Sequence, residues 1–441
     1  MNTKITTTII VVCLLGIATM FSLSYGKCDD KENIKTVDNG CLEHTYDVVE
    51  DAGDVRVIDN RKSFVSGELK YVVIDSRNLF VSVISVQNKE KIVGAFSIPS
   101  KVTHEGTTYT VTEIGPVADI GEIAFHGCRK LQSIVIPNTV TEIHGCPFDK
   151  CSSLTAINVL NPNAKLDESV FFGWGENVEI TFDNAVYRGI VGNPYYLLVK
   201  AKDKTITSCK IHEKCRMIHW EAFNDCKELQ SIDIPNSVES IGNRAFVGCL
   251  KLRSVTIPNS VRSIGPRAFP FCHELMFNVY ENMFYLGNES NPYYALISTK
   301  NNCDPEYKIH ENCEIIASGA FHYTNKATSI TIPNSVKVIG DYAFCYSKTL
   351  QSITLPTSLK EINTGTFSNC PSLTSVTIPN TVTKIGSFAF YNCTSLKSIE
   401  VPNSVTSIGV WTFKGVEDVR CSAEIRECME SLTGEMRRPY R

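Results

Sequence analysis

The 441-residue sequence carries little excess charge and has no long apolar run beyond one near its N-terminus. Its net charge is −4 and its pI is about 6.2, so it lacks the strongly basic character typical of a general nucleic-acid-binding protein. It also lacks a disordered tract, because 43% of its residues are hydrophobic and 20% are charged, as in a globular protein. The chain is long enough for two or three ordinary domains or for one long repeat array.

Recognisable catalytic and nucleotide-binding motifs are missing as well. The sequence contains no G-x-S-x-G elbow, no G-x-x-x-x-G-K phosphate loop and no dinucleotide fingerprint. The pairs His212-Glu213 and His310-Glu311 do not form an HExxH zinc motif, because no second histidine follows at the required spacing. The sequence therefore predicts no enzyme and no cofactor.

The single apolar run is typical of an export signal. Lys4 precedes the apolar stretch from Thr8 to Thr19, and the small residues Ser24 and Gly26 follow it. We predict a signal peptide over residues 1–26 and a secreted or cell-surface protein. The alternative is an uncleaved membrane anchor, since residues 5–23 approach the ~20 residues that a spanning helix needs.

An internal repeat dominates the rest of the chain. One phenylalanine marks each unit, and successive phenylalanines are 23 residues apart except at two gaps of 52. Residues 125–222 align with 223–320 at an offset of 98, which equals three units of 23 and one of 29, and each longer unit carries an Asn-Pro-Tyr-Tyr segment. The marker residues are Phe125, Phe148, Phe171, Phe223, Phe246, Phe269, Phe321, Phe344, Phe367, Phe390 and Phe413.

Each unit has the pattern of one coil. The apolar residues in L-x-S-I-x-I-P alternate as in a half-buried strand, and proline ends the strand because it has no amide hydrogen. After a turn, apolar pairs such as Val238 and Ile241 point to the same side, and an Ala-Phe pair completes the coil. A single unit cannot bury these residues alone, so the pattern predicts a solenoid of stacked coils.

The repeat LxxIxIPxxVxxIGxxAFxxC, over about residues 125–415, resembles the BspA-like, or treponemal-type, leucine-rich repeat family. This resemblance implies a curved solenoid with a strand-lined inner face and membership among exported or surface proteins, some of which are adhesins. It brings no catalytic residues. The Asn-Pro-Tyr-Tyr units depart from the plain repeat, so the curvature there stays open.

The flanks divide the chain further. We expect a linker and small β cap over residues 27–115, because residues 68–76, 79–87 and 107–115 are β-rich runs. The leucine-rich-repeat array then covers 116–415, and 416–441 form a C-terminal cap in which Cys421 and Cys428 are a possible clamp.

The cysteines have two interpretations. Those three positions after the marker phenylalanine are expected to be a buried column of small thiols rather than a redox or metal array, since some units carry Ser347, Thr324 or Trp174 instead. A second group, Cys209, His212, Cys215 and His219, has spacings that suit zinc, but its copy 98 residues later does not keep the ligands. We therefore predict no metal site. The column cysteines are Cys128, Cys151, Cys226, Cys249, Cys272, Cys370 and Cys393.

The outward positions of the predicted strands are the best binding candidates. They form two parallel columns, mostly of hydroxyl groups, which can offer many weak hydrogen bonds to a protein or carbohydrate partner. The tyrosine pairs of the longer units are a second set of candidates, because aromatic side chains commonly anchor a partner. These features predict an adhesion or cell-interaction role. The alternative is a scaffold held at a membrane by the uncleaved N-terminal segment. The candidate residues are Ser231, Asp233, Ser254, Thr256, Ser329, Thr331, Ser352, Thr354, Ser375, Thr377, Ser398, Glu400, Tyr195, Tyr196, Tyr293 and Tyr294.

Overall fold

The structure is a computed structural model that describes residues 63–75, 78–115, 123–174, 179–423, 425, 426 and 429. The chain divides into a unit of residues 1–56 and a unit of residues 57–441, and every described residue belongs to the second unit. The predicted signal peptide and the linker up to residue 62 lie outside the described residues, as does Cys428 of the predicted clamp. No helix of the described segments is long and apolar enough to cross a membrane.

One repeat unit forms one coil with two short strands. The outer strand β26 (Ser352–Thr354) buries Ile353 and exposes the residue on each side of it. Pro356 follows this strand, and the chain turns into the inner strand β27 (Glu361–Ile362). Phe367 then closes the coil and is fully buried. The coil predicted from the repeat is therefore confirmed, with a second strand that the pattern had not indicated.

The outer strands stack in parallel, and their alternating burial places every second side chain in solvent. The register aligns Ser352 with Ser375 and Thr354 with Thr377, so equivalent repeat positions are direct neighbours. The outer strands are β4 (Gly94–Ser97), β7 (Leu131–Ile136), β9 (Ala156–Val159), β14 (Ser208–Lys210), β16 (Ser231–Asp233), β22 (Glu306–Lys308), β24 (Ser329–Thr331), β26, β28 (Ser375–Thr377), β30 (Ser398–Glu400) and β32 (Asp418–Arg420).

The inner strands form a second parallel column. Each is mostly two residues long, and its second residue, such as Ile362 or Ile385, is buried. The inner strands are β6 (Thr107–Ile114), β8 (Glu142–Ile143), β10 (Lys165–Leu166), β15 (Met217–Ile218), β17 (Ser240–Ile241), β18 (Ser263–Ile264), β23 (Ile315–Ile316), β25 (Val338–Ile339), β27, β29 (Lys384–Ile385) and β31 (Ser407–Ile408).

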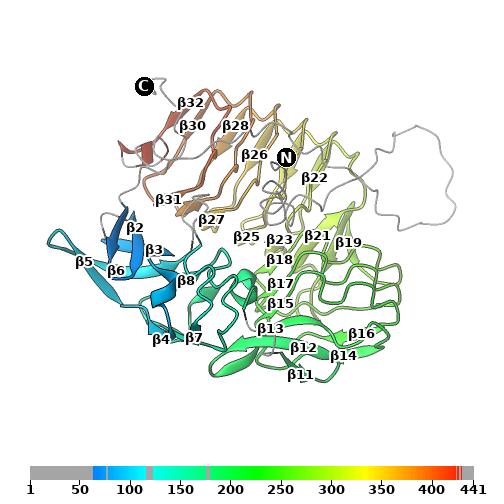
Figure 1. The fold of residues 1–441 in the computed structure, drawn as a ribbon. Coiled ribbons are helices and arrows are strands. Elements are labelled where there is room, and N and C mark those ends of the chain that lie inside the picture. The colour runs from blue at the N-terminus through cyan, green and yellow to red at the C-terminus, as the bar shows by residue number, and fades with distance from the viewer. Residues whose placement is uncertain are drawn as a thin grey trace, which may run out of the picture. The chain divides into compact units, whose positions relative to one another are not determined.

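Within the second unit the coils follow a curve (Figure 1). Strands β15, β17, β18, β23 and β25 lie along its inner side, whereas β14, β16, β22, β26 and β28 lie along its outer side. The strand-lined inner face that the family resemblance implies is thus made by the two-residue strands. The strands that carry the predicted hydroxyl columns lie on the outer side.

Three antiparallel meanders divide the array into blocks. In each meander the third strand pairs in parallel with an inner strand: β3 with β6, β13 with β15 and β21 with β23. The N-terminal cap and the two longer units therefore contain the same structural element, a three-stranded meander that precedes a block of coils. The meanders are β1 (Ser63–Ser66), β2 (Leu69–Asp75) and β3 (Phe80–Val86); β11 (Ile180–Phe182), β12 (Ala185–Ile190) and β13 (Asn193–Ala201); and β19 (Asn278–Tyr280), β20 (Met283–Leu286) and β21 (Ala295–Thr299).

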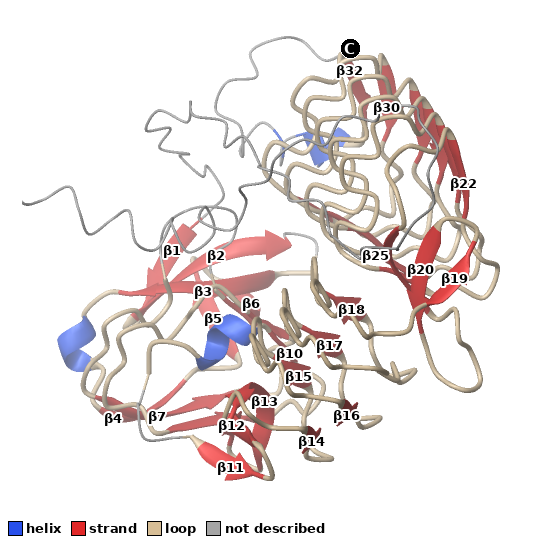
Figure 2. Cartoon of the chain, turned by 90° about the vertical axis from the view of Figure 1, so that its right-hand side faces the viewer, coloured by secondary structure: helices blue, strands red, loops and turns tan. Residues whose placement is uncertain are grey.

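The cap has further elements of its own. Strand β5 (Lys101–His104) pairs antiparallel with β6, and β4 pairs in parallel with β7, so the outer column already begins inside the predicted cap. The three β-rich runs expected over residues 68–115 correspond to β2, β3 and β6. Within the described residues, helix is limited to short segments, among them the 3₁₀ turns Lys89–Lys91 and Glu168–Phe171 (Figure 2).

The marker phenylalanines form the spine of the core. Phe344, Phe367 and Phe390 are fully buried, and each ring centroid is 5.3 Å from the next. Similar stacks join Phe125 to Phe148 at 5.8 Å and Phe246 to Phe269 at 5.0 Å. Because each ring covers the next coil, no coil is stable without its neighbours.

Candidate binding faces

The hydroxyl columns on the outer strands are exposed. The predicted positions are in solvent, except that Ser329 is half-buried. The strand predicted to carry Ser254 and Thr256 is absent: Ser254 makes only an isolated parallel bridge with Ser231, and Thr256 lies outside the strands. Thr354 and Thr377 have no side-chain hydrogen bond to the described part of the chain, whereas the neighbouring Thr374 donates to the Gln351 carbonyl at 2.9 Å. The column hydroxyls therefore keep their hydrogen-bonding capacity for a partner or for water.

The first tyrosine of each pair is packed against a histidine. The rings of Tyr195 and His212 stack with centroids 3.6 Å apart, and those of Tyr293 and His310 stack at 3.9 Å. The Nδ1 atom of His212 accepts the backbone amide hydrogen of Lys214 at 3.0 Å, and His310 makes the equivalent contact. All four rings are half-buried, so each offers only one part of its surface to a partner.

A third aromatic residue in each meander accepts a hydrogen bond from the backbone amide of this histidine. The hydroxyl oxygen of Tyr187 accepts the backbone amide hydrogen of His212 at 3.1 Å, and Tyr285 does the same for His310 at 3.1 Å. In the 23-residue units the position of His212 is occupied by proline, which has no amide hydrogen and needs no such acceptor. Both tyrosines are fully buried and were not singled out from the sequence, although they stand 98 residues apart.

The second tyrosine of each pair packs between coils. Tyr294 is 4% exposed, and its hydroxyl lies 3.0 Å from the Asn259 carbonyl oxygen and 2.9 Å from that of Val261. Tyr196 is half-buried and stacks on Phe171 at 5.5 Å. Tyr294 therefore has almost no surface with which to anchor a partner.

The column cysteines are buried hydrogen-bond donors. The Sγ atoms of Cys370 and Cys393 each donate to the carbonyl of the marker phenylalanine one coil earlier, both at 3.1 Å. Ser347 makes the same contact with Phe321 at 3.2 Å, which explains why serine can replace cysteine there. Burial raises the pKa of Cys393 to about 12, so its thiol is protonated at neutral pH.

The four residues with zinc-like spacing have structural partners. Cys215 is fully buried, its thiol donates to the Met217 carbonyl at 3.2 Å, and burial raises its pKa to about 12. His219 is 6% exposed and packs against Phe172. In the parts of the chain that are described, no group of three or more His, Cys, Asp or Glu side chains is placed to hold a metal ion.

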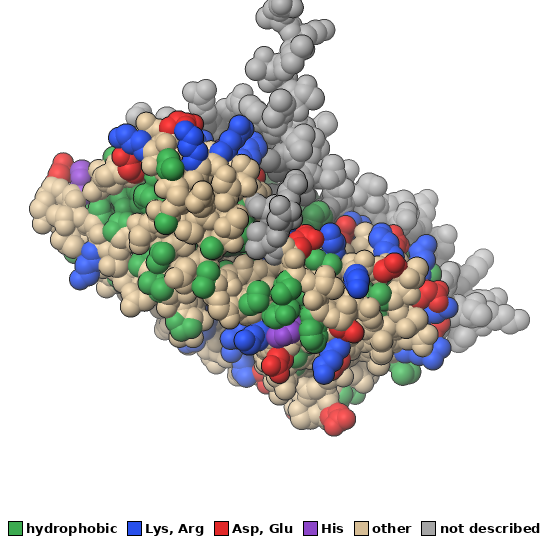
Figure 3. Space-filling view, turned by 60° about the horizontal axis from the view of Figure 1, so that its bottom comes forward, with side chains coloured by type: hydrophobic (Ala, Val, Ile, Leu, Met, Phe, Trp, Pro, Cys, Tyr) green, Lys and Arg blue, Asp and Glu red, His purple; other side chains and the backbone are tan. Residues whose placement is uncertain are grey.

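Charged side chains lie directly before several inner strands, in contrast to the hydroxyl columns. Side chains of opposite sign one repeat apart form ion pairs between neighbouring coils, such as Arg216 with Glu239 and Lys337 with Glu314, both at 2.6 Å. On the face shown in Figure 3, acidic and basic side chains are likewise interspersed. These ion pairs match neighbouring coils in charge.

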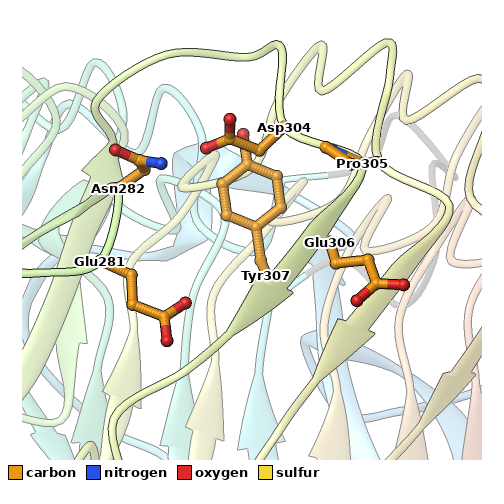
Figure 4. A pocket seen from close by; sticks show the side chains of 6 residues that line it. All are labelled: Glu281, Asn282, Asp304, Pro305, Glu306 and Tyr307. Carbon is orange, nitrogen blue, oxygen red and sulfur yellow. The ribbon is translucent and has the colours of Figure 1, made fainter.

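A shallow acidic pocket of about 190 Å³ lies beside the second longer unit. Its walls carry Glu281, Asp304 and Glu306 around the ring of Tyr307 (Figure 4). The hydroxyl of Tyr307 donates to the Asn301 carbonyl at 2.7 Å, so this group is already engaged. This pocket has no local sequence signal, because its residues come from a meander turn and an outer strand that are separate in the chain.

Comparison with known proteins identifies the repeat. The sequence model described as "BspA type Leucine rich repeat region" matches six copies over residues 99–189, 201–313 and 314–423. No curated protein matches the chain.

Several solved structures align with this chain. One is a leucine-rich cell surface protein from Faecalibacterium prausnitzii, with 24% identity over 86% of this chain and 99% of that one and a TM-score of 0.35. A leucine-rich repeat protein from Bacteroides ovatus has 24% identity over 84% and 98% of the two chains, with a TM-score of 0.28. The pneumococcal vaccine antigen PcpA has 18% identity over 82% and 89%, with a TM-score of 0.32.

Proposed function

The chain belongs to the BspA-type leucine-rich repeat family, and we propose that it is an exported or cell-surface member that binds a protein or glycan surface through its outer strand face, in adhesion or cell interaction. In this proposal the chain acts by binding and not by catalysis, and it has no nucleic-acid partner. The membrane is involved at most through the N-terminal segment.

The observation that supports the proposal is the regular spacing of exposed hydroxyl groups on the outer strands. Hydroxyl groups such as those of Ser352, Thr354, Ser375 and Thr377 repeat in register on neighbouring strands and are exposed. Each hydrogen bond to a partner contributes little, about 0.5–1.5 kcal/mol net, so binding requires many of them along an extended ligand. A regular column supplies that number without any rearrangement of the chain.

Two lysines on this face test the proposal. Thr354→Lys with Thr377→Lys places two positive charges side by side, because these residues are register partners. Thr383→Lys with Thr406→Lys makes the same chemical change next to the inner strands, where both threonines are exposed, and is the matched control. Binding of the purified proteins to matrix proteins, glycan arrays and whole cells is measured. We expect loss of binding for the outer pair and retention for the control.

The tyrosines provide an independent second candidate. If binding survives the outer lysines but is lost when Tyr195, Tyr196, Tyr293 and Tyr294 are changed to alanine, the longer units form the site and the strand-face proposal is wrong. Tyr195, Tyr196 and Tyr293 are half-buried and Tyr294 is buried, so circular dichroism has to confirm that the variants fold. If neither set matters, the array is a spacer, and residues 28–111 become the region to test.

The location of the protein is tested separately. Mass spectrometry of the mature N-terminus distinguishes a cleaved signal peptide, with a new N-terminus near Ser24 to Gly26, from an uncleaved anchor. An intact N-terminus in the membrane fraction would favour the alternative, a membrane-held scaffold without an adhesion role.

A further inference from the structure

The first residue of each inner strand occupies the same repeat position, and among these residues from β8 to β31 only Ile315 is buried. From β8 to β31 this position is charged in four strands and uncharged in the six others. The charged residues form two pairs. The two members of a pair lie in adjacent coils, and the pairs are about two hundred residues apart in the chain. In order, the residues are Glu142, Lys165, Met217, Ser240, Ser263, Ile315, Val338, Glu361, Lys384 and Ser407.

The curve of the array brings the two charged pairs together. The Nζ atom of Lys165 is 3.5 Å from a carboxylate oxygen of Glu142 in the neighbouring coil and 3.6 Å from one of Glu361 in the last block. The Nζ atom of Lys384 is 3.9 Å from the other carboxylate oxygen of Glu142. Glu361 and Lys384 are register partners on neighbouring strands, so the charges of the four residues alternate from one neighbour to the next.

The order of the charges is specific to this arrangement. Both pairs read Glu and then Lys along the chain, and they meet in opposite order, so that Glu142 faces Lys384 and Lys165 faces Glu361. If one pair had the reverse order, like charges would face each other and repel. Sequence order and geometry are separate observations, and both favour attraction between the first and the last block.

The contact depends on ionic strength. The side chain of Lys165 is 70% exposed and that of Lys384 is 48% exposed, so each ion pair alone is weak and screened by salt. Burial acts to lower the pKa of Lys165, but the carboxylates of Glu361 and Glu142 outweigh this effect and raise it. The first and last blocks therefore attract each other at low ionic strength and less so at high ionic strength.

We propose that Glu142, Lys165, Glu361 and Lys384 form a salt-sensitive latch that holds the first block of coils against the last. The latch joins inner strands and is independent of binding by the outer face.

Zero-length carbodiimide cross-linking of the full chain tests the latch, because it joins a lysine to a carboxylate only when the two are in contact. At low salt we expect peptides that link Lys165 to Glu361. At about 1 M salt, where the Debye length is about 3 Å, their yield should fall several-fold. The link between Lys337 and Glu314, in adjacent coils, is the matched control and should persist. Absence of the first link at low salt, or its presence only between two molecules, overturns the proposal.

A charge swap gives a second readout. Glu142→Lys with Lys165→Glu keeps the net charge and the pair between neighbouring coils, but makes like charges face each other across the curve. We expect the radius of gyration from small-angle scattering at low salt to increase. Adding Glu361→Lys with Lys384→Glu should restore it. Circular dichroism confirms that both variants fold, and an unchanged radius in the first variant overturns the proposal.

Discussion

Replacing Phe367 with alanine removes one ring from the spine of the array. The side chain is fully buried and lies between the rings of Phe344 and Phe390, with centroids 5.3 Å away on each side. A phenylalanine-to-alanine change in a packed core costs about 3–5 kcal/mol, because apolar contacts are lost and a cavity remains. We expect a value in the upper part of this range, since both stacked neighbours lose a contact.

Thr377→Ala is the matched control in the next coil. Its side chain is exposed and has no hydrogen bond to the described part of the chain, so the change should alter the free energy of unfolding by less than about 0.5 kcal/mol. The two variants therefore differ by at least about 2.5 kcal/mol.

Urea denaturation followed by circular dichroism measures the difference between these variants. Hydrogen exchange shows where Phe367→Ala acts: because the apolar packing of a coil is with its neighbouring coils, protection should fall first around β27 and β29. Equal destabilisation by the two variants would mean that the buried and exposed faces of the coil have been assigned the wrong way round. A uniform loss of protection along the array would contradict the solenoid energetics.

Three further predictions concern other contacts of the array. Tyr187→Phe leaves the amide hydrogen of His212 without its acceptor and should lower the free energy of unfolding by about 1–3 kcal/mol in urea titrations; no change would show that water replaces the hydroxyl. Burial lowers the pKa of His219 to about 4, below its ordinary value near 6.5, so the stability due to the neutral ring is lost as the pH falls from about 6.5 to 4. The stability advantage of wild type over His219→Gln should therefore shrink by up to about 3 kcal/mol between pH 7 and pH 4, and a difference independent of pH would refute the neutral buried imidazole. Deleting residues 344–366, one clean unit, lets β24 pair with β28 and should leave a folded protein by circular dichroism, whereas total loss of structure would argue against stacked coils.

Several features of the molecule were predictable from sequence because they repeat locally. Alternation around Ile353 assigns the exposed and buried sides of an outer strand, and the spacing of 23 residues places Phe344 and Phe367 at the same point of successive coils. Stacking then follows, because one unit cannot bury its own apolar residues. The β-rich runs of the N-terminal cap were identified in the same way. None of these inferences needs a contact between distant segments.

The structural role of the tyrosines in the longer units could not be predicted from the sequence. The Asn-Pro-Tyr-Tyr segments looked equally suited to anchoring a partner and to forming a turn. The first copy begins β13, and the second lies in a turn before β21. The hydrogen bond from the His212 amide to Tyr187 joins residues 25 positions apart, one in the segment after β14 and the other on β12. A single sequence contains no local pattern that indicates such a pairing.

The sequence by itself therefore determined the coil, the period, the buried phenylalanine spine and the exposure of the hydroxyl columns. Only the tertiary structure decided on which side of the curve each column lies, that the cap and the longer units are equivalent meanders, and that Lys165 meets Glu361. The physical reason is that curvature is the sum of small rotations between successive coils. No single unit encodes that sum, so contacts across the curve appear only when all the coils are in place.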